Sequence, residues 1–284
     1  MSTTTIITIA RCLLFSTALV ISGWAIGPLG GLGAWTPPQS GADDADTAAA
    51  ARSSFTQRLF NWHPVLMSTF LVCAGEAMLA YRSNAPLPLM VVAAAAAPPP
   101  PPPPSRPARK AAHATLHTLA LAVALLGSTA AWRSHSLAQP PIPHLYSPHS
   151  WLGLCAMLMF VAQAAMGARA YLAAWPVERR ASFVPWHRLA GLCAFFAALA
   201  AVATGVQEKA TFAQAFGGAG MRGGAVAGAA AIEVGVLLSG LAVAAAFFAP
   251  VGCGGGGSGF VAVAAATEEE GLLPSPRGDR GGGG

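Results

Sequence analysis

The amino-acid sequence predicts an all-α integral membrane protein with six transmembrane helices, of which the central four form a bundle. Of its 284 residues, 54% are hydrophobic and only 10% are charged, whereas soluble globular proteins carry about 25% charged residues. The apolar residues also fall in blocks of about twenty, the length of helix needed to cross roughly 30 Å of hydrocarbon. Composition and block length together exclude an ordinary soluble domain.

The first apolar block, residues 6–28, contains a single charged residue, Arg11. The block is long for the core of a signal peptide, and no clear small-residue cleavage site follows it. We therefore predict an N-terminal transmembrane helix within residues 1–28. Residues 29–58 are rich in Gly, Pro, Ser and Ala and contain three aspartates, a composition typical of a loop, here on the outer side.

Five further apolar blocks predict the remaining transmembrane helices. Their approximate limits are 59–81, 111–132, 149–172, 186–205 and 225–249. We predict a four-helix core domain over residues 59–212, followed by a loop and the sixth helix over residues 213–249. The Gly-rich residues 250–284 are expected to form a disordered cytosolic tail.

Two low-complexity stretches lie between the helices. The Ala/Pro run at 93–104 ends in seven consecutive prolines, Pro98–Pro104, which favour an extended polyproline spacer. A GxGxxG sequence at 218–223 lies in the Gly-rich stretch 217–224. Its flanks are predicted membrane helices and not the strand that a dinucleotide site needs, so we interpret this stretch as a loop.

The net charge of +5 comes from basic residues in the short segments between the apolar blocks, as the positive-inside rule predicts. No basic helix, aromatic platform or zinc-finger spacing indicates nucleic-acid binding. With the N-terminus in the cytosol, nine Lys and Arg residues fall in inner segments and five in outer ones, so we predict that both termini are cytosolic. The inner set is Arg82, Arg106, Arg109, Lys110, Arg169, Arg179, Arg180, Arg277 and Arg280, and the outer set is Arg52, Arg58, Arg133, Lys209 and Arg222.

Four histidines lie near the ends of the four central apolar blocks: His63, His113, His149 and His187. Because successive helices run in opposite directions, His63 and His149 begin helices that enter from the outer side. His113 and His187 begin helices that enter from the cytosol. Depth in the membrane therefore pairs His63 with His149 near the outer face and His113 with His187 near the inner face.

Two facing neutral imidazoles within a helical bundle are suitable axial ligands for haem iron. Because the sequence has no CxxCH motif, we expect two haem groups held non-covalently, one at each pair. Two axial histidines favour electron transfer over oxygen binding. For any single histidine the alternative is an interfacial residue among the lipid headgroups, but four at matched helix ends indicate function, since histidines inside membrane helices are costly.

His117 lies four residues after His113 and therefore on the same helix face. An HxxxH pair can chelate Zn²⁺ or Fe²⁺, which leaves a haem-free divalent-metal transporter as an alternative function. Against it, the sequence offers no intramembrane carboxylate cluster, since only Glu76 and Glu233 stand out, on separate helices. A structural haem subunit of a larger complex is a third alternative.

Short motifs surround the four histidines. They are FNWHPVLM at 60–67, GEAMLAYR at 75–82, RKAAH at 109–113, YSPHSWLG at 146–153, and PWH at 185–187 followed by Gly191, TG at 204–205 and EK at 208–209. In combination they resemble the cytochrome b561 family of transmembrane ascorbate-dependent oxidoreductases, over about residues 55–212. The resemblance implies six transmembrane helices and two b-type haems, with the same four ligands and with His117 outside the ligand set.

The resemblance also implies electron transfer from cytosolic ascorbate to monodehydroascorbate or ferric chelates on the opposite side. Ascorbate is a monoanion at neutral pH, so Arg82, Arg109 and Lys110 are expected to hold it through charge-assisted hydrogen bonds. Their alternative role is as positive-inside anchors. On the outer side, His135 matches a histidine that the family uses around its second substrate site, where it can exchange a proton.

Three further points follow from the resemblance. The family tends toward dimers, which suggests a homodimer in the lipid bilayer. The Ala/Pro run at 93–104 is a departure from the family pattern, because it lengthens the loop that should shape the ascorbate site. No sorting signal distinguishes an endomembrane, vacuolar or plasma-membrane location.

Overall fold

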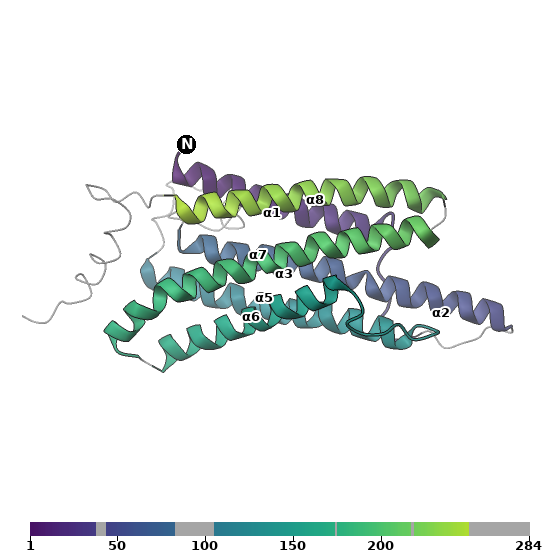
Figure 1. Ribbon diagram of the computed structural model, residues 1–284, viewed down its shortest axis with the longest axis horizontal. Helices are drawn as coiled ribbons and strands as arrows, with labels where there is room; N and C mark the ends of the chain where they lie inside the picture. Colours follow the sequence, from purple (N-terminus) through teal and green to yellow (C-terminus); the bar gives the residue numbers. More distant parts are fainter. Residues whose placement is uncertain (38–43, 83–104, 174, 217–218, 250–284) are drawn as a thin grey trace, which may run out of the picture. The chain divides into compact units, whose positions relative to one another are not determined.

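The computed structural model describes residues 1–37, 44–82, 105–173, 175–216 and 219–249. The described residues form helices joined by short connections (Figure 1). The Ala/Pro run at 93–104 and the tail at 250–284 lie outside the described residues. The spacer and the disordered tail therefore remain predictions from the sequence.

The first and last helices, α1 (Thr3–Ile26) and α8 (Ala219–Phe248), lie side by side (Figure 1). Small residues permit the close approach, as is usual between membrane helices. A side chain at Gly228 would collide with Trp24, and one at Gly235 would collide with Thr17. The Thr17 hydroxyl also shares a 3.1 Å hydrogen bond with a buried serine of α8.

The four central helices are α3 (Trp62–Ala80), α5 (Arg106–Leu137), α6 (Pro148–Leu172) and α7 (Val177–Phe216). They pack as two pairs, α3 with α5 and α6 with α7, and the pairs meet chiefly through α3 and α7. Helix α6 begins sharply because Ser147 forms a capping box with Ser150 and proline occupies the first helical turn. The central bundle is therefore two helix pairs with limited direct contact between α5 and α6.

A buried ion pair joins the peripheral helix α1 to the central bundle. Arg11 Nε lies 3.1 Å from Glu76 Oε2, and both side chains are less than a tenth exposed. Opposite charges inside a membrane protein are usually paired in this way, because a lone charge there is expensive to bury. Arg11 and Glu76, which both lie within predicted transmembrane blocks, thus neutralise each other.

The prediction of a loop throughout residues 29–58 was wrong for its second half, which forms helix α2 (Ala45–Phe60). Asp44 caps this helix by accepting a 2.7 Å hydrogen bond from the backbone N–H of Thr47. Four consecutive alanines, at 48–51, then favour the helix. Figure 1 shows that α2 continues in the direction of α3 and projects from the bundle.

Three other boundaries differ from the prediction. Helix α5 ends at Leu137 and not near the predicted limit of 132, so His135 lies on its last turn. Helix α7 runs through the predicted domain boundary at 212–213. The predicted glycine-rich loop at 217–224 is helical from Ala219 onward. Each helix continues past its apolar block because polar residues outside the hydrocarbon can still complete helical hydrogen bonds.

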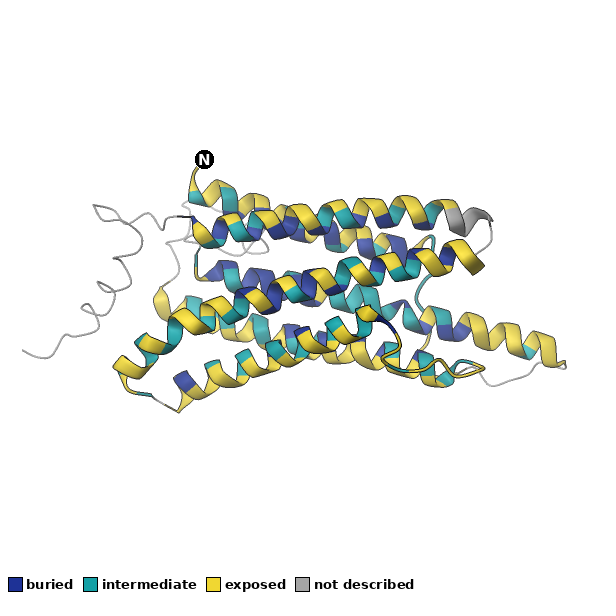
Figure 2. Ribbon diagram, in the orientation of Figure 1, coloured by how far each residue is buried: buried dark blue, intermediate teal, exposed yellow. Residues whose placement is uncertain are grey.

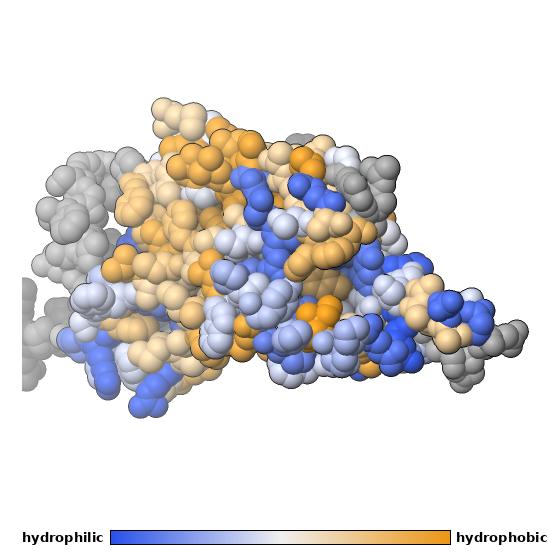
Figure 3. Space-filling view, turned by 45° about the vertical axis from the view of Figure 1, so that its right-hand side comes forward, coloured by the Kyte–Doolittle hydropathy of each residue, from blue (hydrophilic) through white to orange (hydrophobic). Residues whose placement is uncertain are grey.

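The prediction of six membrane-spanning helices is confirmed. Within the described ranges, six helical segments are long and apolar enough to cross a bilayer, with α2 and α3 counted as one. Figure 2 shows exposed residues along these helices. Many of the exposed residues are large and apolar, as a lipid-facing surface requires. Figure 3 shows apolar side chains over much of the helical surface, with hydrophilic groups gathered toward α2 and toward the opposite end. The chain is a multi-pass integral membrane protein.

Candidate functional site

The outer pair, named from the predicted topology, consists of His63 on α3 and His149 on α6. Their ring centroids lie 6.0 Å apart, with the rings nearly perpendicular. His63 Nδ1 is hydrogen-bonded to the Gly127 carbonyl at 3.0 Å. His149 Nδ1 is hydrogen-bonded to the Ala201 carbonyl at 2.8 Å. Because a carbonyl can only accept, each Nδ1 carries the proton and each Nε2 retains a lone pair.

The inner pair consists of His113 on α5 and His187 on α7. Their ring centroids lie 6.4 Å apart. His113 Nδ1 donates to the Ala77 carbonyl at 2.8 Å, which leaves its Nε2 lone pair available. The Nδ1 of His187 is buried and has no hydrogen-bond partner within the described part of the chain. The structure therefore brings together the two pairs that the depth argument predicted, and it orients three of the four rings through backbone carbonyls.

The spacing of each pair fits a metal shared between two imidazoles. A metal–imidazole bond measures about 2 Å, so two rings on opposite sides of one metal have centroids roughly 6 Å apart. Both observed separations, 6.0 and 6.4 Å, match this value. Histidines that bind a metal usually donate their other ring N–H to a carbonyl or carboxylate, which fixes the tautomer and the ring orientation.

Each pair also bridges the two helix pairs, since its members come from α3 and α6 or from α5 and α7. The fourth residue after His149 is Gly153, and the fourth after His187 is Gly191, so each glycine shares a helix face with its histidine. No atom lies within 4 Å of a side chain built at either glycine. Space beside the histidines is therefore open, as the flat ring of a haem requires.

A third glycine supports the outer pair by direct contact. A Cβ atom at Gly205 would lie 2.6 Å from His149 Cε1, which is too close for any side chain. Helix α7 can therefore hold the imidazole of His149 against its backbone only because residue 205 is glycine. The donor set and the open space together fit two haems, with His63, His113, His149 and His187 as the residues that would hold the iron.

The three cations predicted to bind ascorbate lie at the inner end of the bundle. Arg82 donates from Nε to the Ala246 carbonyl at 3.2 Å and from its terminal nitrogen to the Ala249 carbonyl. Burial and the nearby Arg188 lower the pKa of Arg82. Lys110 lies on the first turns of α5, with Nζ 5.2 Å from the ring centre of Tyr171. Arg82 therefore holds the C-terminal end of α8, a contact that the sequence did not predict.

Tyr81 lies beside the inner pair, a contact that the sequence did not predict. Its ring lies 5.0 Å from that of His113 in an edge-to-face contact. Burial, together with the nearby Tyr171, raises the pKa of Tyr81 to about 12, although Arg106 and Arg109 act in the opposite direction. The phenol is therefore a neutral hydrogen-bonding group beside the inner pair and the basic first turns of α5.

His135 belongs to a cluster of rings at the outer end, next to the outer pair. Phe60 lies 5.5 Å from the His63 ring and stacks on His135 at 6.1 Å. His135 in turn stacks on His144 at 5.8 Å, and His144 stacks on the exposed Trp132 at 3.6 Å. A continuous series of rings thus runs from the half-buried outer pair to the surface.

Charged and phenolic groups border this ring cluster. Tyr146 donates a hydrogen bond to Glu208, and burial and that carboxylate raise the pKa of Tyr146 well above its usual value. Lys209 Nζ lies 4.7 Å above the Phe60 ring. The sequence predicted only His135 here, because the other members come from separate segments that only the fold brings together.

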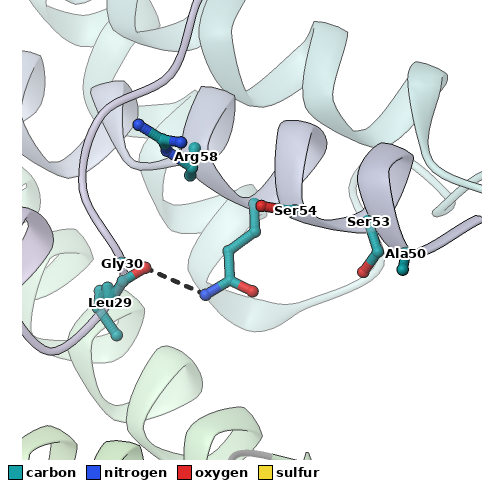
Figure 4. A pocket seen from close by; sticks show the side chains of 7 residues that line it. Leu29, Gly30, Ala50, Ser53, Ser54 and Arg58 are labelled. Atoms are coloured by element: carbon teal, nitrogen blue, oxygen red, sulfur yellow. Dashed lines mark hydrogen bonds between the residues drawn. The ribbon is translucent and has the colours of Figure 1, made fainter. Parts of the chain in front are cut away.

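Two surface cavities, of about 350 and 620 Å³, lie between helix α2 and the segment that follows α1. Figure 4 shows the first of them, bordered by Ser53, Ser54 and Arg58, where a hydrogen bond from the unlabelled Gln57 fixes the Leu29 carbonyl. Neither cavity is lined by one of the four paired histidines. Across the described ranges, no group of three or more His, Cys, Asp or Glu side chains could hold a metal ion.

Comparison with known proteins shows consistent similarity. A family model described as eukaryotic cytochrome b561 matches residues 102–213. Transmembrane ascorbate ferrireductase 2 of Arabidopsis thaliana is 31% identical over 211 residues, covering 72% of this chain and 74% of that protein. A lysosomal membrane ascorbate-dependent ferrireductase of Rattus norvegicus is 36% identical over 159 residues, and a plasma membrane ascorbate-dependent reductase of Mus musculus is 34% identical over 155 residues. The matches span 56% and 48% of these two mammalian relatives, respectively.

Proposed function

The chain belongs to the cytochrome b561 family, and from that premise we propose that it is an ascorbate-dependent oxidoreductase that moves single electrons across a membrane. The donor is ascorbate at the cytosolic face. The acceptor at the opposite face is monodehydroascorbate or a ferric chelate. The printed names of the relatives, which describe ascorbate-dependent ferrireductases and reductases, support this assignment.

The observation that carries the proposal is the pair of facing imidazoles at each end of one helical bundle. His63 and His149 would hold one haem b, and His113 and His187 the other, both non-covalently. Haem b supplies a one-electron couple between ferric and ferrous iron when it is bound. The protein contributes fixed tautomers, through the carbonyls of Gly127, Ala77 and Ala201, and an apolar surrounding that keeps water away from the bundle.

At the inner face, the residues proposed to bind ascorbate are Arg109 and Lys110 on the first turns of α5, together with Arg82. Ascorbate is a monoanion, and hydrogen bonds from cations to anionic oxygens are about twice as strong as neutral ones. Arg82 already donates to two carbonyls of α8, but a guanidinium has five N–H donors and can hold a second acceptor. The neutral Tyr81 phenol adds a further hydrogen-bonding group.

The two half-reactions place different demands on the two faces. Loss of one electron and one proton converts the ascorbate monoanion to monodehydroascorbate, and the reverse change at the outer face takes up a proton. His135 lies in the ring cluster next to the outer pair and can hold that proton. Reduction of a ferric chelate needs no proton, so the role of His135 distinguishes the two acceptors.

The alternative of a metal transporter using His113 and His117 gains no specific support. Over the ranges that the structure describes, no cluster of three metal-binding side chains includes the pair. We therefore propose no second function.

The decisive experiment is a difference spectrum, ascorbate-reduced minus oxidised, of the purified protein together with its haem-to-protein ratio. We expect two haems per chain, with one lost in His63→Ala and the other in His113→Ala. His144→Ala is the matched control, because His144 belongs to neither pair and both haems should remain. Wild-type protein that contains no haem after expression in haem-replete cells would contradict the proposal.

A further inference from the structure

The buried ion pair between α1 and α3 lies next to the group that orients the inner ligand. Arg11 Nε on α1 donates a 3.1 Å hydrogen bond to Glu76 Oε2 on α3. The following residue, Ala77, lies on the last turn of α3, and its carbonyl accepts the 2.8 Å hydrogen bond from His113 Nδ1. The position of the His113 ring therefore depends on where the last turn of α3 lies.

A packing contact holds the same part of α3 against α1. A Cβ atom at Gly75 would lie 2.5 Å from Leu14 Cδ1, so glycine at this position leaves room for that side chain. Leu14 lies one turn after Arg11 on α1, and both side chains are buried. Helix α1 therefore contacts the two residues that directly precede Ala77.

A second polar contact joins α3 to α1 and its following segment at the outer end, next to His63. The side chain of Asn61 is completely buried. Its Nδ2 atom lies 2.8 Å from the carbonyls of both Leu29 and Gly31, in the segment that follows α1. Trp62 Nε1 donates to a further carbonyl of this segment, that of Gly33, at 2.8 Å. His63 is the next residue of α3.

Both contacts therefore reach the histidine pairs through α3. Among the four central helices, α1 packs chiefly against α3. The ion pair lies near the end of α3 that orients His113, and Asn61 lies at the end that carries His63. A change in either contact should accordingly act on one histidine pair and not on the other.

We propose that α1 and its following segment position the two histidines that depend on α3, His113 through the Arg11–Glu76 ion pair and His63 through Asn61. This inference rests on the proposed function, because it gives the two contacts the task of keeping haem ligands in place. Arg11, Glu76 and Asn61 are thus positioning residues and not iron ligands. The simpler alternative is that these buried contacts hold α1 in the fold and do nothing for the ligands.

Loss of a contact has two expected effects on its haem. A hydrogen bond from Nδ1 to a carbonyl orients a ligating imidazole and makes it more basic, and the loss of such a partner typically costs 10- to 100-fold in metal affinity. A more basic ligand stabilises ferric iron, so displacement of the Ala77 carbonyl from His113 should raise the inner midpoint potential. Displacement of His63 from its partner, the Gly127 carbonyl, should do the same at the outer haem.

The test uses the purified full-length protein, with midpoint potentials from spectroelectrochemical titration and rates of haem loss to apomyoglobin. Arg11→Leu combined with Glu76→Leu removes the ion pair without leaving a lone charge, a change that proteins often tolerate. Arg11→Gln combined with Glu76→Gln keeps a weaker, uncharged hydrogen bond. Asn61→Leu removes the outer contact at similar size. Thr17→Val is the matched control, because Thr17 joins α1 to α8 and not to α3.

We expect the leucine pair to raise the inner midpoint and to release the inner haem roughly tenfold faster, as the loss of an outer-shell partner predicts. The glutamine pair should show the same changes to a smaller extent. Asn61→Leu should change only the outer haem, and Thr17→Val should change neither. His113→Ala identifies which redox transition belongs to the inner haem.

Each contact is judged by its own haem. Unchanged values at that haem, equal changes at both haems, or the same changes in Thr17→Val would overturn the inference. A shifted inner midpoint without faster haem loss would also overturn it, because the electric field of the ion pair would then explain the shift.

Milder variants decide if a leucine variant does not fold. The glutamine pair replaces the leucine pair, and Trp62→Phe, which removes the hydrogen bond to Gly33, replaces Asn61→Leu. In each, a raised midpoint with faster loss of the expected haem supports the inference, and wild-type values contradict it. Wild-type protein without haem would overturn the proposed function as well, whereas two haems that stay unchanged in the variants would overturn the inference alone.

Discussion

Backbone carbonyls fix the orientation and the tautomer of three candidate haem ligands. His63, His113 and His149 each donate Nδ1–H to a carbonyl on a neighbouring helix, at 2.8 to 3.0 Å. Two consequences follow from each bond. The lone pair stays on Nε2, and the ring is held in one rotamer before any metal arrives. Pre-orientation of this kind lowers the entropic cost of binding a large cofactor without a covalent link.

Gly205 should be indispensable for the outer pair. Alanine at this position would place Cβ 2.6 Å from His149 Cε1, and overpacking of this type costs about 1–3 kcal/mol. We expect Gly205→Ala to lose much of the outer haem and to keep the inner one, as measured by the haem-to-protein ratio and the difference spectrum. Gly23→Ala is the control, because nothing lies within 4 Å of its Cβ. Full haem content in Gly205→Ala would show that His149 can move aside.

Tyr81 leads to a prediction about pH. Because its pKa is raised to about 12, the phenol stays protonated and keeps its donor at every pH where ascorbate reduction can be measured. Wild-type KM for ascorbate should therefore show no step from this group between neutral pH and about pH 9. In Tyr81→Phe we expect KM to rise roughly 2- to 10-fold, the value of one hydrogen bond.

Tyr146→Phe is the matched control for this change, since it removes a phenol at the opposite end of the bundle. Stopped-flow reduction of the haem by ascorbate measures both variants. An unchanged KM in Tyr81→Phe would exclude the phenol from the ascorbate site. A wild-type pH step that disappears in the variant would show that Tyr81 ionises well below its expected pKa.

At the scale of elements, α2 depends on its N-terminal cap. The pKa of the Asp44 carboxyl is lowered by hydrogen bonds from the Thr47 backbone and side chain. A carboxyl whose pKa falls on folding stabilises the folded form above its unfolded pKa of about 4, and this contribution is lost as the pH drops through the folded pKa. We expect faster amide exchange over Ala45–Phe60 in Asp44→Ala at neutral pH.

Asp44→Asn is the appropriate control, because asparagine caps a helix as well as aspartate does but does not titrate. Hydrogen exchange measured by mass spectrometry should show protection of α2 that is independent of acid in Asp44→Asn and lost on acidification in the wild type. Equal exchange in all three proteins would mean that α2 is held by its contacts with α5 and not by its cap.

Much of the bundle could be predicted from the length and spacing of the apolar blocks in the sequence. Apolar block length predicted six spanning helices, and alternation of helix direction paired the four histidines as the structure does. The partners of those histidines could not be predicted in this way. Gly127, Ala201 and Ala77 lie 64, 52 and 36 residues from the rings they orient. A glycine or alanine in the sequence gives no sign that its backbone carbonyl accepts a hydrogen bond from a distant side chain.

Helix α2 shows a different reason for error. The glycines, prolines and aspartates of residues 29–46 predict a loop, whereas the alanines at 48–51 favour the helix that the structure contains. The hydrogen bonds of Arg82 to the end of α8 could not be predicted either, because they depend on a helix that lies far along the sequence. The composition of a segment predicts its local structure, whereas the contacts of its side chains depend on the fold.

At the scale of the whole molecule, the bundle has a built-in polarity. The inner pair lies next to Tyr81 and the basic first turns of α5, and the outer pair lies next to the ring cluster that contains His135. A carrier of this kind passes electrons in one direction only if the donor binds at one end. The distribution of binding residues, and not the haem ligands themselves, would set that direction.

The chain offers a direct test of this polarity, because its two lysines, Lys110 and Lys209, mark opposite ends of the bundle. An amine reagent that cannot cross the membrane should label only one of them from outside sealed proteoliposomes. In vesicles that expose Lys110, external ascorbate should reduce a ferric chelate trapped inside.

In vesicles that expose Lys209, external ascorbate should reduce the trapped chelate at least roughly tenfold more slowly, since charge-assisted hydrogen bonds contribute about 1.5–3 kcal/mol each. Arg109→Gln combined with Lys110→Gln should abolish most of that difference, whereas Arg52→Gln, on α2, should leave it intact. Equal rates from both sides in the wild type would show that ascorbate binding does not set the direction of transfer.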